Sequence, residues 1–367
     1  MLIHRVERLY KQMESAGMDA LVVNPGSSLS YLTGLDFHLM ERPTLAFFVP
    51  GKKPVLVIPK LELVKLSEME YEVDAILYDE DPSLWQTSFD EAASKLGLKG
   101  KRIGAEPLAL RLLELGYIQK ACDPKIIDAT ALIATLRAQK DASELEKIQI
   151  ATNIAQTALQ ATLPLVKIGM TEREVAAELV IQLLRAGCPP NLPFGPIVSS
   201  GPNSANPHAS PSDRKIQSGD LLLFDWGARH DNYISDLTRT FAIGDVDPEF
   251  IKIHDIVHQA NAAGRAAGKP GAPASLVDIA ARQVIEAAGY GKYFTHRTGH
   301  GIGLDVHEDP YMRADNLQPL LPGNCYTVEP GIYIAGKNGV RIEDDMYITE
   351  QGAVSFSDMP REIKVIA

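Results

Sequence analysis

The first third of the chain alternates short apolar runs with stretches of helical periodicity. Leu2, Val6, Leu9 and Met13 recur among charged residues at the spacing of an amphipathic helix. Further along, the pattern predicts strands at 20–23, 45–49, 55–58 and 75–78, with a helix at 60–69 before the last of them. The alternation continues to about residue 125 and predicts an α/β domain. No phosphate-binding glycine pattern follows these strands, so nucleotide binding has no motif to support it.

The residue composition of the sequence changes in the second half. Asp141 followed by Glu144 is a capping-box pair, which predicts the start of a long helix. From about residue 190, Gly, Pro, His and Asp become frequent, and two further helices are predicted at 248–267 and 275–288. Seven of the nine histidines lie from His208 onward. We therefore expect the chemistry of the protein in its carboxy-terminal half.

Length and charge limit the classes of protein to consider. At roughly 150 residues per domain, 367 residues predict about two domains, which we place at 1–130 and 131–367. The chain has 36 Lys and Arg residues against 47 Asp and Glu residues, a net charge of −11. Nucleic acids and anionic membranes select basic surfaces, so neither is expected as the main partner.

The cysteines and the apolar runs bear on location. Cys122, Cys188 and Cys325 are widely spaced and form no CxxC pair, which is typical of a protein in a reducing compartment. No apolar run approaches the roughly 18 residues that a membrane span requires. The first residues have the pattern of an amphipathic helix and not of a signal peptide. We therefore expect a cytoplasmic protein.

Two aspartates are predicted to face each other across a β-hairpin. Apolar runs on both sides of a polar turn contain Asp225 and Asp236. If the turn centres on His230 and Asp231, these aspartates lie opposite each other. Opposed side chains start roughly 5 Å apart at Cβ. Two carboxylates at that distance repel each other unless a cation lies between them.

A second acidic pair repeats this arrangement. Glu329 and Glu343 lie at equal distances from Gly336, which begins a Gly-Lys-Asn-Gly turn, so they too are predicted to approach each other across a hairpin. Between the two pairs lies a glycine-rich segment that contains His300. Its glycines allow the backbone to come close to a site, and His300 offers a nitrogen ligand.

These five side chains together favour a metal site. Taken singly, each motif is more often structural, as an Asp after a strand is usually a turn former. Four carboxylates and one imidazole suit two divalent cations about 3.5–4 Å apart, and their charges balance. The oxygen-rich set favours Mn²⁺, with Co²⁺, Fe²⁺ and Zn²⁺ as alternatives. Ca²⁺ is disfavoured because there is no EF-hand spacing.

The order of these residues resembles a known family. The segments SDLTRT, GHGIGLDVHE, VEPGIY and VRIEDD are similar to those of the pita-bread metallopeptidases, which include Xaa-Pro dipeptidase (prolidase), Xaa-Pro aminopeptidase and methionine aminopeptidase. The resemblance covers about residues 140–367, and the preceding part resembles the creatinase/prolidase amino-terminal domain. It implies an α/β plus α+β protein, with a creatinase/prolidase-like domain over 1–130 and a pita-bread catalytic domain over 131–367. Methionine aminopeptidases lack the first domain, so the proline-specific branch is favoured.

The resemblance also implies which residue binds which metal ion. In the family, the residues at Asp236 and Glu343 bridge the two ions. The residue at Asp225 binds one ion, and those at His300 and Glu329 bind the other. All five residues are present in this chain, which distinguishes it from relatives that have lost the site.

Further roles follow from the same resemblance. Glu329 is expected to carry a proton to the leaving proline nitrogen as a general acid/base. His208 and His307 match the family histidines that hydrogen-bond the substrate and the tetrahedral intermediate, and they complete the expected catalytic set. His296 and Arg341 match positions near the metals, where we expect them to orient the ligands.

Substrate recognition is assigned to three more residues. Phe194 resembles a residue that packs on the proline ring. Arg313 lies about two residues beyond the position at which prolidases grip the free carboxylate of a dipeptide. His38, in a charged loop, resembles a residue of bacterial prolidases that reaches toward the active site of the partner subunit. A solvated surface loop is the alternative for this segment.

The leading hypothesis is a prolidase that cleaves Xaa-Pro dipeptides and forms a homodimer. An Xaa-Pro aminopeptidase acting on longer peptides is the first alternative. A lyase-type enzyme on the same scaffold is the second, and a binding module on an inactive peptidase fold is the third, which the complete ligand set disfavours.

Overall fold

The computed structural model describes residues 2–367, which form two compact units. The amino-terminal unit extends to Arg137 and the carboxy-terminal unit begins at Ala138. This division falls within the last turn of α5 (Thr130–Ala138).

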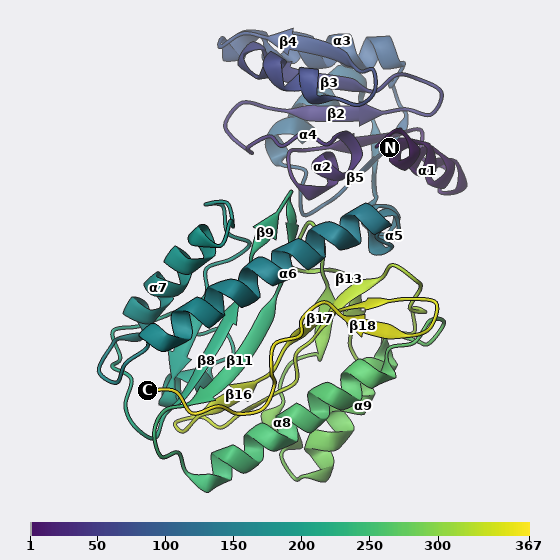
Figure 1. Ribbon diagram of the computed structural model, residues 1–367. Coiled ribbons are helices and arrows are strands. Elements are labelled where there is room, and N and C mark those ends of the chain that lie inside the picture. Colours follow the sequence, from purple (N-terminus) through teal and green to yellow (C-terminus); the bar gives the residue numbers. More distant parts are fainter. Residues whose placement is uncertain (1) are drawn as a thin grey trace. The chain divides into compact units, whose positions relative to one another are not determined.

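A six-stranded mixed sheet forms the centre of the amino-terminal unit (Figure 1). Its strand order is β4-β3-β2-β1-β5-β6, and β2 is antiparallel to both of its neighbours. The strands are β1 (Ala20–Val23), β2 (Leu45–Phe48), β3 (Val55–Pro59), β4 (Asp74–Tyr78), β5 (Arg102–Ala105) and β6 (Lys125–Asp128). The four predicted strands and the α/β character of this region are therefore confirmed.

Four helices accompany this sheet. They are α1 (Leu2–Ser15), α2 (Ser27–Thr33), α3 (Trp85–Leu96) and α4 (Leu112–Cys122). α1 buries Val6, Leu9 and Met13, as its periodicity predicts. The segment expected to form an α-helix at 60–69 is instead a 3₁₀ helix, η1 (Lys60–Glu68), and a second, η2 (Pro82–Leu84), precedes α3. None of the residues of η1 is buried, so no apolar face stabilises a longer regular helix there.

Two separate sheets organise the carboxy-terminal unit. The first has the order β11-β8-β7 and the second the order β13-β12-β14-β17-β18. Two short ladders, β9 with β10 and β15 with β16, complete the strands. A bridge between Thr238 in β11 and Glu343 joins the first sheet to the segment that leads into the second. The strands are β7 (Ile197–Ser200), β8 (Leu221–Trp226), β9 (Arg229–His230), β10 (Tyr233–Ile234), β11 (Leu237–Ala242), β12 (Gly299–Gly301), β13 (Glu308–Met312), β14 (Cys325–Val328), β15 (Gly331–Tyr333), β16 (Gly339–Arg341), β17 (Asp344–Ile348) and β18 (Ala353–Ser355).

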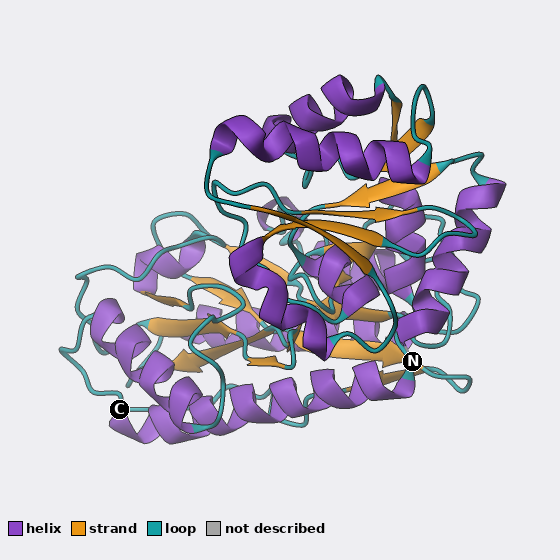
Figure 2. Cartoon of the chain, turned by 90° about the horizontal axis from the view of Figure 1, so that it is seen from above, coloured by secondary structure: helices purple, strands orange, loops and turns teal. Residues whose placement is uncertain are grey.

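Two pairs of helices cover these strands. One pair is α6 (Ala142–Thr162) and α7 (Glu172–Arg185), whose apolar residues pack with those of β7, β8 and β11. The other is α8 (Pro248–Ala267) and α9 (Ser275–Ala287), close to the predicted positions. In Figure 2 the helices flank the strands. The capping box that opens α6 is confirmed. Within residues 2–367, none of the helices is long and apolar enough to cross a bilayer.

The first hairpin has a different register from the predicted one. Asp225 lies opposite Thr238, so the expected pairing with Asp236 is wrong by two residues. The turn centres on Asp231 and Asn232, which have φ values of 45° and 67°. Asp and Asn tolerate this left-handed conformation, which a tight hairpin turn requires. Because side chains alternate between the faces of a strand, a shift of two residues leaves Asp225 and Asp236 on the same face.

The second hairpin has the predicted register. On one side Val328 lies opposite Asp344, and on the other Gly331 lies opposite Arg341. Glu329 and Glu343 fall between these two ladders and therefore face each other.

The three cysteines are free thiols in buried positions. Cys122 ends α4, Cys188 follows α7 and Cys325 begins β14. Burial raises the pKa of Cys122 to about 11 and that of Cys325 to about 12. At neutral pH these two thiols stay protonated.

Candidate metal centre

The five predicted ligands line one cavity of about 890 Å³ in the carboxy-terminal unit. Asp236, His300 and Glu343 each offer a ligand atom within 4.8 Å of the others. Nε2 of His300 lies 3.5 Å from Oε1 of Glu329, which brings the fourth residue into the group. The fifth, Asp225, extends from β8 into the same cavity. We call these five residues the ligand cluster.

The backbones of Asp236 and Glu343 are fixed by hydrogen bonds to neighbouring segments. The N–H of Asp236 donates to Oδ2 of Asp345 at 2.9 Å. The N–H of Glu343 donates to the carbonyl of Thr238 at 3.1 Å, and the Thr238 hydroxyl donates to Oε2 of Glu343 at 2.7 Å. Side chains held in this way need little rearrangement to bind a ligand.

Burial and mutual repulsion shift the pKa values of the carboxyl groups. Burial, together with the charge of Glu343, raises the pKa of Asp236 and that of Glu329 well above their ordinary values. Burial and the charge of Asp225 raise the pKa of Glu343 to about 8. The positive charge of Arg341, which lowers the pKa values of Glu329 and Glu343, does not offset these effects.

The imidazole of His300 is poised to act as a neutral ligand. Burial, with a smaller contribution from His307, lowers the pKa of His300 to about 3. Its Nδ1 lies 3.1 Å from the carbonyl of Gly301, which leaves Nε2 directed at the carboxylates. A hydrogen bond on one ring nitrogen is the usual way in which the other is oriented toward a metal.

The cluster fits divalent cations. Oδ1 of Asp225 and Oδ1 of Asp236 are buried and have no hydrogen-bond partner among the described residues. Buried oxygens without partners are costly, and a metal ion is one of the few groups that can satisfy them. The donor set of four carboxylates and one neutral imidazole meets this requirement.

Arg341 provides one positive charge at the edge of the cluster. Its Nη2 donates to Oδ2 of Asp225 at 2.5 Å, and its Nε donates to Oγ1 of Thr238 at 3.0 Å. Its Nη1 donates to the Tyr333 hydroxyl at 2.9 Å. This single guanidinium pairs with Oδ2 of Asp225 and leaves its Oδ1 without a partner, so all four carboxylates still offer an oxygen to cations.

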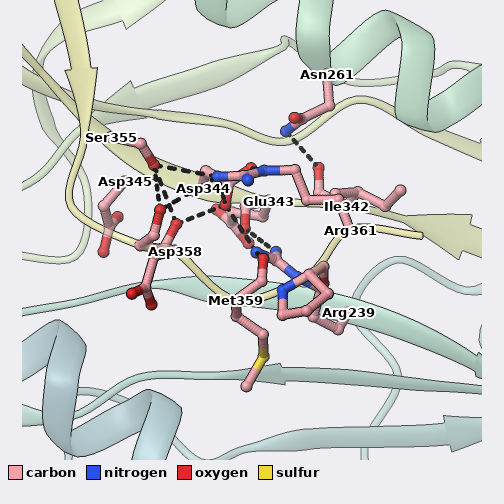
Figure 3. Close-up of polar contacts among 12 residues, drawn as sticks. Arg239, Asn261, Ile342, Glu343, Asp344, Asp345, Ser355, Asp358, Met359 and Arg361 are labelled. Carbon is pink, nitrogen blue, oxygen red and sulfur yellow. Dashed lines mark hydrogen bonds and ion pairs between the residues drawn. The ribbon is translucent and has the colours of Figure 1, made fainter. Parts of the chain in front are cut away.

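A network of charged residues holds the backbone of Glu343 and the side chain of its neighbour Asp344 (Figure 3). Arg239 donates to the carbonyl of Glu343 at 2.7 Å and to Oδ1 of Asp344 at 2.8 Å. Arg361 donates to both oxygens of Asp344, and Ser357 donates to Oδ1. Although burial opposes ionisation, Arg239 and Arg361 lower the pKa of Asp344. The residue next to Glu343 is therefore held as a fully compensated carboxylate.

The two histidines predicted to act in catalysis also line the cavity. The ring of His307 lies edge-on to that of His300, with 4.2 Å between their centres. Burial lowers the pKa of His307, which favours its neutral form. His208 lies in the loop after η4 (Gly201–Ala205), where its side chain is exposed.

Most of the residues predicted to bind substrate or orient ligands are found there too. Phe194, His296 and Arg313 line the cavity. Nε2 of His296 lies 2.9 Å from the Tyr333 hydroxyl, and burial lowers the pKa of His296 to about 4. Arg313 is mostly exposed and pairs with Asp315 at 3.0 Å. His38 belongs to the amino-terminal unit, where its side chain is exposed, and its role stays a prediction.

Sequence reasoning missed Arg297. This residue lines the cavity, and its guanidinium lies 4.6 Å from the centre of the Tyr311 ring. Within residues 2–367, no carboxylate lies within ion-pair distance of it. Its position between His296 and His300 in the sequence is the signal that could have identified it.

Two family models match the chain. The model of metallopeptidase family M24 matches residues 146–350. The model of the creatinase/prolidase N-terminal domain matches residues 5–139. The expected order of these two folds is therefore confirmed.

Individual proteins are similar over almost the whole chain. An Xaa-Pro dipeptidase of Lactobacillus delbrueckii subsp. lactis is 34% identical, with 98% of each chain covered. The crystal structure of a dipeptidase from Pyrococcus horikoshii OT3 superposes with a TM-score of 0.93 at 36% identity, covering 99% of this chain and 100% of the other. That of an X-Pro aminopeptidase from Thermotoga maritima MSB8 has a TM-score of 0.86 at 32% identity, covering 98% and 99%.

Proposed function

The chain belongs to metallopeptidase family M24, and we propose that it hydrolyses the peptide bond before proline in Xaa-Pro dipeptides. The observation that carries this proposal is the ligand cluster, in which buried carboxylates surround a neutral imidazole inside one cavity. Such a site is expensive to build without cations, because buried carboxylates without compensation oppose folding. The dipeptidases among the similar proteins support the choice of substrate.

We propose that Asp225, Asp236, His300, Glu329 and Glu343 hold two divalent ions, with Mn²⁺ as the expected metal and Co²⁺, Fe²⁺ or Zn²⁺ as alternatives. When bound, two such ions acidify a shared water and polarise the scissile carbonyl. The family resemblance assigns the bridging positions to Asp236 and Glu343. The oxygen-rich donor set supports Mn²⁺.

Residues in and around the cluster supply the proton transfer and the substrate contacts of the reaction. Glu329 carries a proton to the leaving proline nitrogen as a general acid/base. His307, which is neutral because burial lowers its pKa, donates an N–H to the oxygen that develops negative charge. His208 makes the corresponding contact from the exposed side of the cavity. His296 and Arg341 both contact the Tyr333 hydroxyl, and Arg341 in turn orients Asp225.

The cavity also contains groups suited to the two ends of a short substrate. Phe194 offers an aromatic surface for the proline ring. A dipeptide ends in a carboxylate next to that ring, and two arginines of the cavity wall could receive it. Arg313 already pairs with Asp315, whereas Arg297 has no carboxylate partner among the described residues. We therefore propose Arg297 beside Arg313 as the anchor for this carboxylate.

We further propose that the protein acts as a homodimer in the cytoplasm. The buried, protonated thiols and the net charge of −11 support a reducing compartment and disfavour polyanionic partners. His38 and its charged loop are assigned to the partner's active site in this dimer.

The deciding experiment compares dipeptides with tripeptides after reconstitution with Mn²⁺. Hydrolysis of Gly-Pro-type dipeptides, with little cleavage of Xaa-Pro-Yaa tripeptides, supports the proposal. Cleavage of tripeptides alone would identify an Xaa-Pro aminopeptidase, the alternative that the similar Thermotoga maritima enzyme favours. Bound metal without turnover of any Xaa-Pro peptide would favour a lyase-type enzyme.

A further inference from the structure

The loop that carries His208 is fastened at both ends by one buried carboxylate, that of Glu172. Glu172 lies in the first turn of α7 and has no exposed surface. Its Oε1 accepts hydrogen bonds from the backbone N–H of Ser200 at 2.6 Å and from the Ser200 hydroxyl at 2.9 Å. Its Oε2 accepts from the N–H of Ser212 at 3.1 Å and from the Ser212 hydroxyl at 2.6 Å. Ser200 precedes the loop and Ser212 follows it.

A third residue of the same segment completes the arrangement. The side-chain amide of Asn203 donates to both oxygens of Glu172, at 3.2 and 3.1 Å. One carboxylate therefore accepts from five donor groups. Hydrogen bonds to an ionised acceptor are roughly twice as strong as those between neutral groups. The position near the N-terminus of α7 also favours negative charge.

The rest of the loop has further bonds of its own: the N–H of Gly339 donates to Oγ of Ser204 at 2.8 Å, and the N–H of His208 donates to Oδ1 of Asn206 at 3.1 Å. Ser200 ends β7, where it lies opposite Leu222 of β8, the strand that also carries Asp225. Further along, Nη1 of Arg341 donates to the carbonyl of Pro207 at 3.4 Å. The side chain of His208 itself is exposed. Because these bonds hold the backbone and not the imidazole, the position of the imidazole depends on how the loop backbone is fixed, including at its two ends.

We propose that Glu172 is a positioning residue that acts through His208. By closing the loop between Ser200 and Ser212, it removes in advance the conformational freedom that His208 would otherwise lose when substrate binds. This inference rests on the proposed function for the role of His208 but not for the tether itself. None of the five metal ligands lies in the loop, so metal binding should not depend on Glu172.

The test uses Glu172→Gln with Glu174→Gln as its matched control. Both glutamates lie in the first turn of α7, but Glu174 is exposed and forms the capping box with Thr171. A glutamine at 172 keeps the shape but turns an NH₂ group toward the serine donors. We expect its kcat to fall by about 10²-fold, the size expected for a misplaced catalytic group. E174Q should stay within about twofold of the wild type, and metal content should be unchanged in both.

A double-mutant cycle separates positioning from general structural support. If Glu172 acts through His208, then E172Q added to H208A should lower kcat no further than H208A alone. A merely structural role would lower kcat by the same factor in both backgrounds. That multiplicative result, or an E172Q enzyme as active as E174Q, would overturn the proposal.

A measurement independent of activity completes the design. Amide hydrogen exchange over residues 201–211 should be faster in E172Q than in wild type and E174Q, with other segments unchanged. Unchanged exchange in the loop contradicts the tether, even if the wild-type enzyme cleaves no Xaa-Pro peptide and the proposed function fails. If E172Q does not fold, Ser212→Ala removes one donor without changing charge, and the same comparison applies with a smaller effect.

Discussion

Two ion pairs, one from each unit of this protein, lie in different surroundings. In the amino-terminal unit, Lys53 pairs with Glu72 while their side chains are 42% and 86% exposed. In the carboxy-terminal unit, Arg239 pairs with Asp344 while their side chains are 3% and 0% exposed. Exposed pairs contribute little because water and salt screen them. A buried pair costs the desolvation of both ions, and removing one partner leaves an uncompensated buried charge, so the effect of a substitution depends on how deeply the pair is buried.

The buried charges are of two kinds. Asp344 is compensated by Arg239 and Arg361, which lower its pKa. Asp236 and Glu343 form no ion pair with an arginine or lysine among the described residues, and burial with neighbouring carboxylates raises their pKa values. The paired carboxylate of Asp344 belongs to the folded scaffold without any ligand. The carboxylates of Asp236 and Glu343 would gain their positive partners only when cations bind. The comparison therefore separates residues that support the site from residues that form it.

The largest effect should come from a change in the ligand cluster. Replacing Asp236 by Asn removes a proposed bridging carboxylate and should lower kcat/KM for an Xaa-Pro dipeptide by at least about 10³-fold, roughly 4 kcal/mol. Bound metal, measured by elemental analysis, should fall with it. Asp231→Asn, an exposed change in the turn of the same hairpin, is the control and should leave both unchanged. Full activity of D236N would remove the basis for the site.

The compensated charges should show their effect in stability. Arg239→Met removes one of the arginines that compensate the buried carboxylate of Asp344. The free energy of unfolding in urea should fall by about 3–5 kcal/mol. Arg173→Met breaks an exposed pair with Asp213 and should change the unfolding midpoint little. Equal shifts for the two variants would contradict the comparison. If R239M does not fold, R239K keeps the charge and should be destabilised less.

The uncompensated charges should make the stability of the metal-free protein fall as pH rises. Burial raises the pKa of Glu343 from 4.5 to about 8, so the folded state holds a proton that the unfolded state has released. Above about pH 6.5, His300 is neutral in both states and no longer opposes this trend. With a chelator present, Tm should therefore fall between pH 6.5 and 8. Excess Mn²⁺ should abolish the fall, and a chelated protein whose Tm rises over this range would contradict the assignment.

The smallest effect is expected at the exposed pair of the amino-terminal unit. Lys53→Met removes contacts to Glu72 at 2.8 Å and to Asp74 at 3.6 Å. Because the side chains of Glu72, Lys53 and Asp74 are 86%, 42% and 30% exposed, water and salt screen these contacts, and Tm should change by less than about 2 °C at physiological salt. A larger change, measured by calorimetry, would mean that this surface pair matters more than its exposure suggests.

Much of this arrangement could be predicted because its signals are local. The strands at 20–23 and 55–58 follow apolar runs, and the position of Gly336 in its turn is enough to bring Glu329 and Glu343 together. The first hairpin was predicted two residues out of register, because Asp231 and Asn232 can both adopt left-handed backbone and either neighbouring pair could form the turn.

Other parts of the site depend on contacts between distant segments. Arg341 reaches Asp225 across 116 positions of sequence. From the sequence, Glu172 is indistinguishable from any acidic residue in the first turn of a helix. Only the fold brings Ser200 and Ser212 to it. Periodicity carries no information on such partners, because it describes which face of an element is buried and not what the element meets.

The buried thiols allow the rate of unfolding to be measured separately in the two units. Thiolates, not thiols, react with alkylating reagents, so Cys122 and Cys325, with pKa values of about 11 and 12, should be silent while the chain is folded. Cys122 belongs to one unit, and Cys188 and Cys325 belong to the other. Pulsed alkylation followed by peptide mass mapping would therefore report the rate at which the cysteines of each unit become accessible. It would record which unit opens first under heat or chelation, without any engineered label.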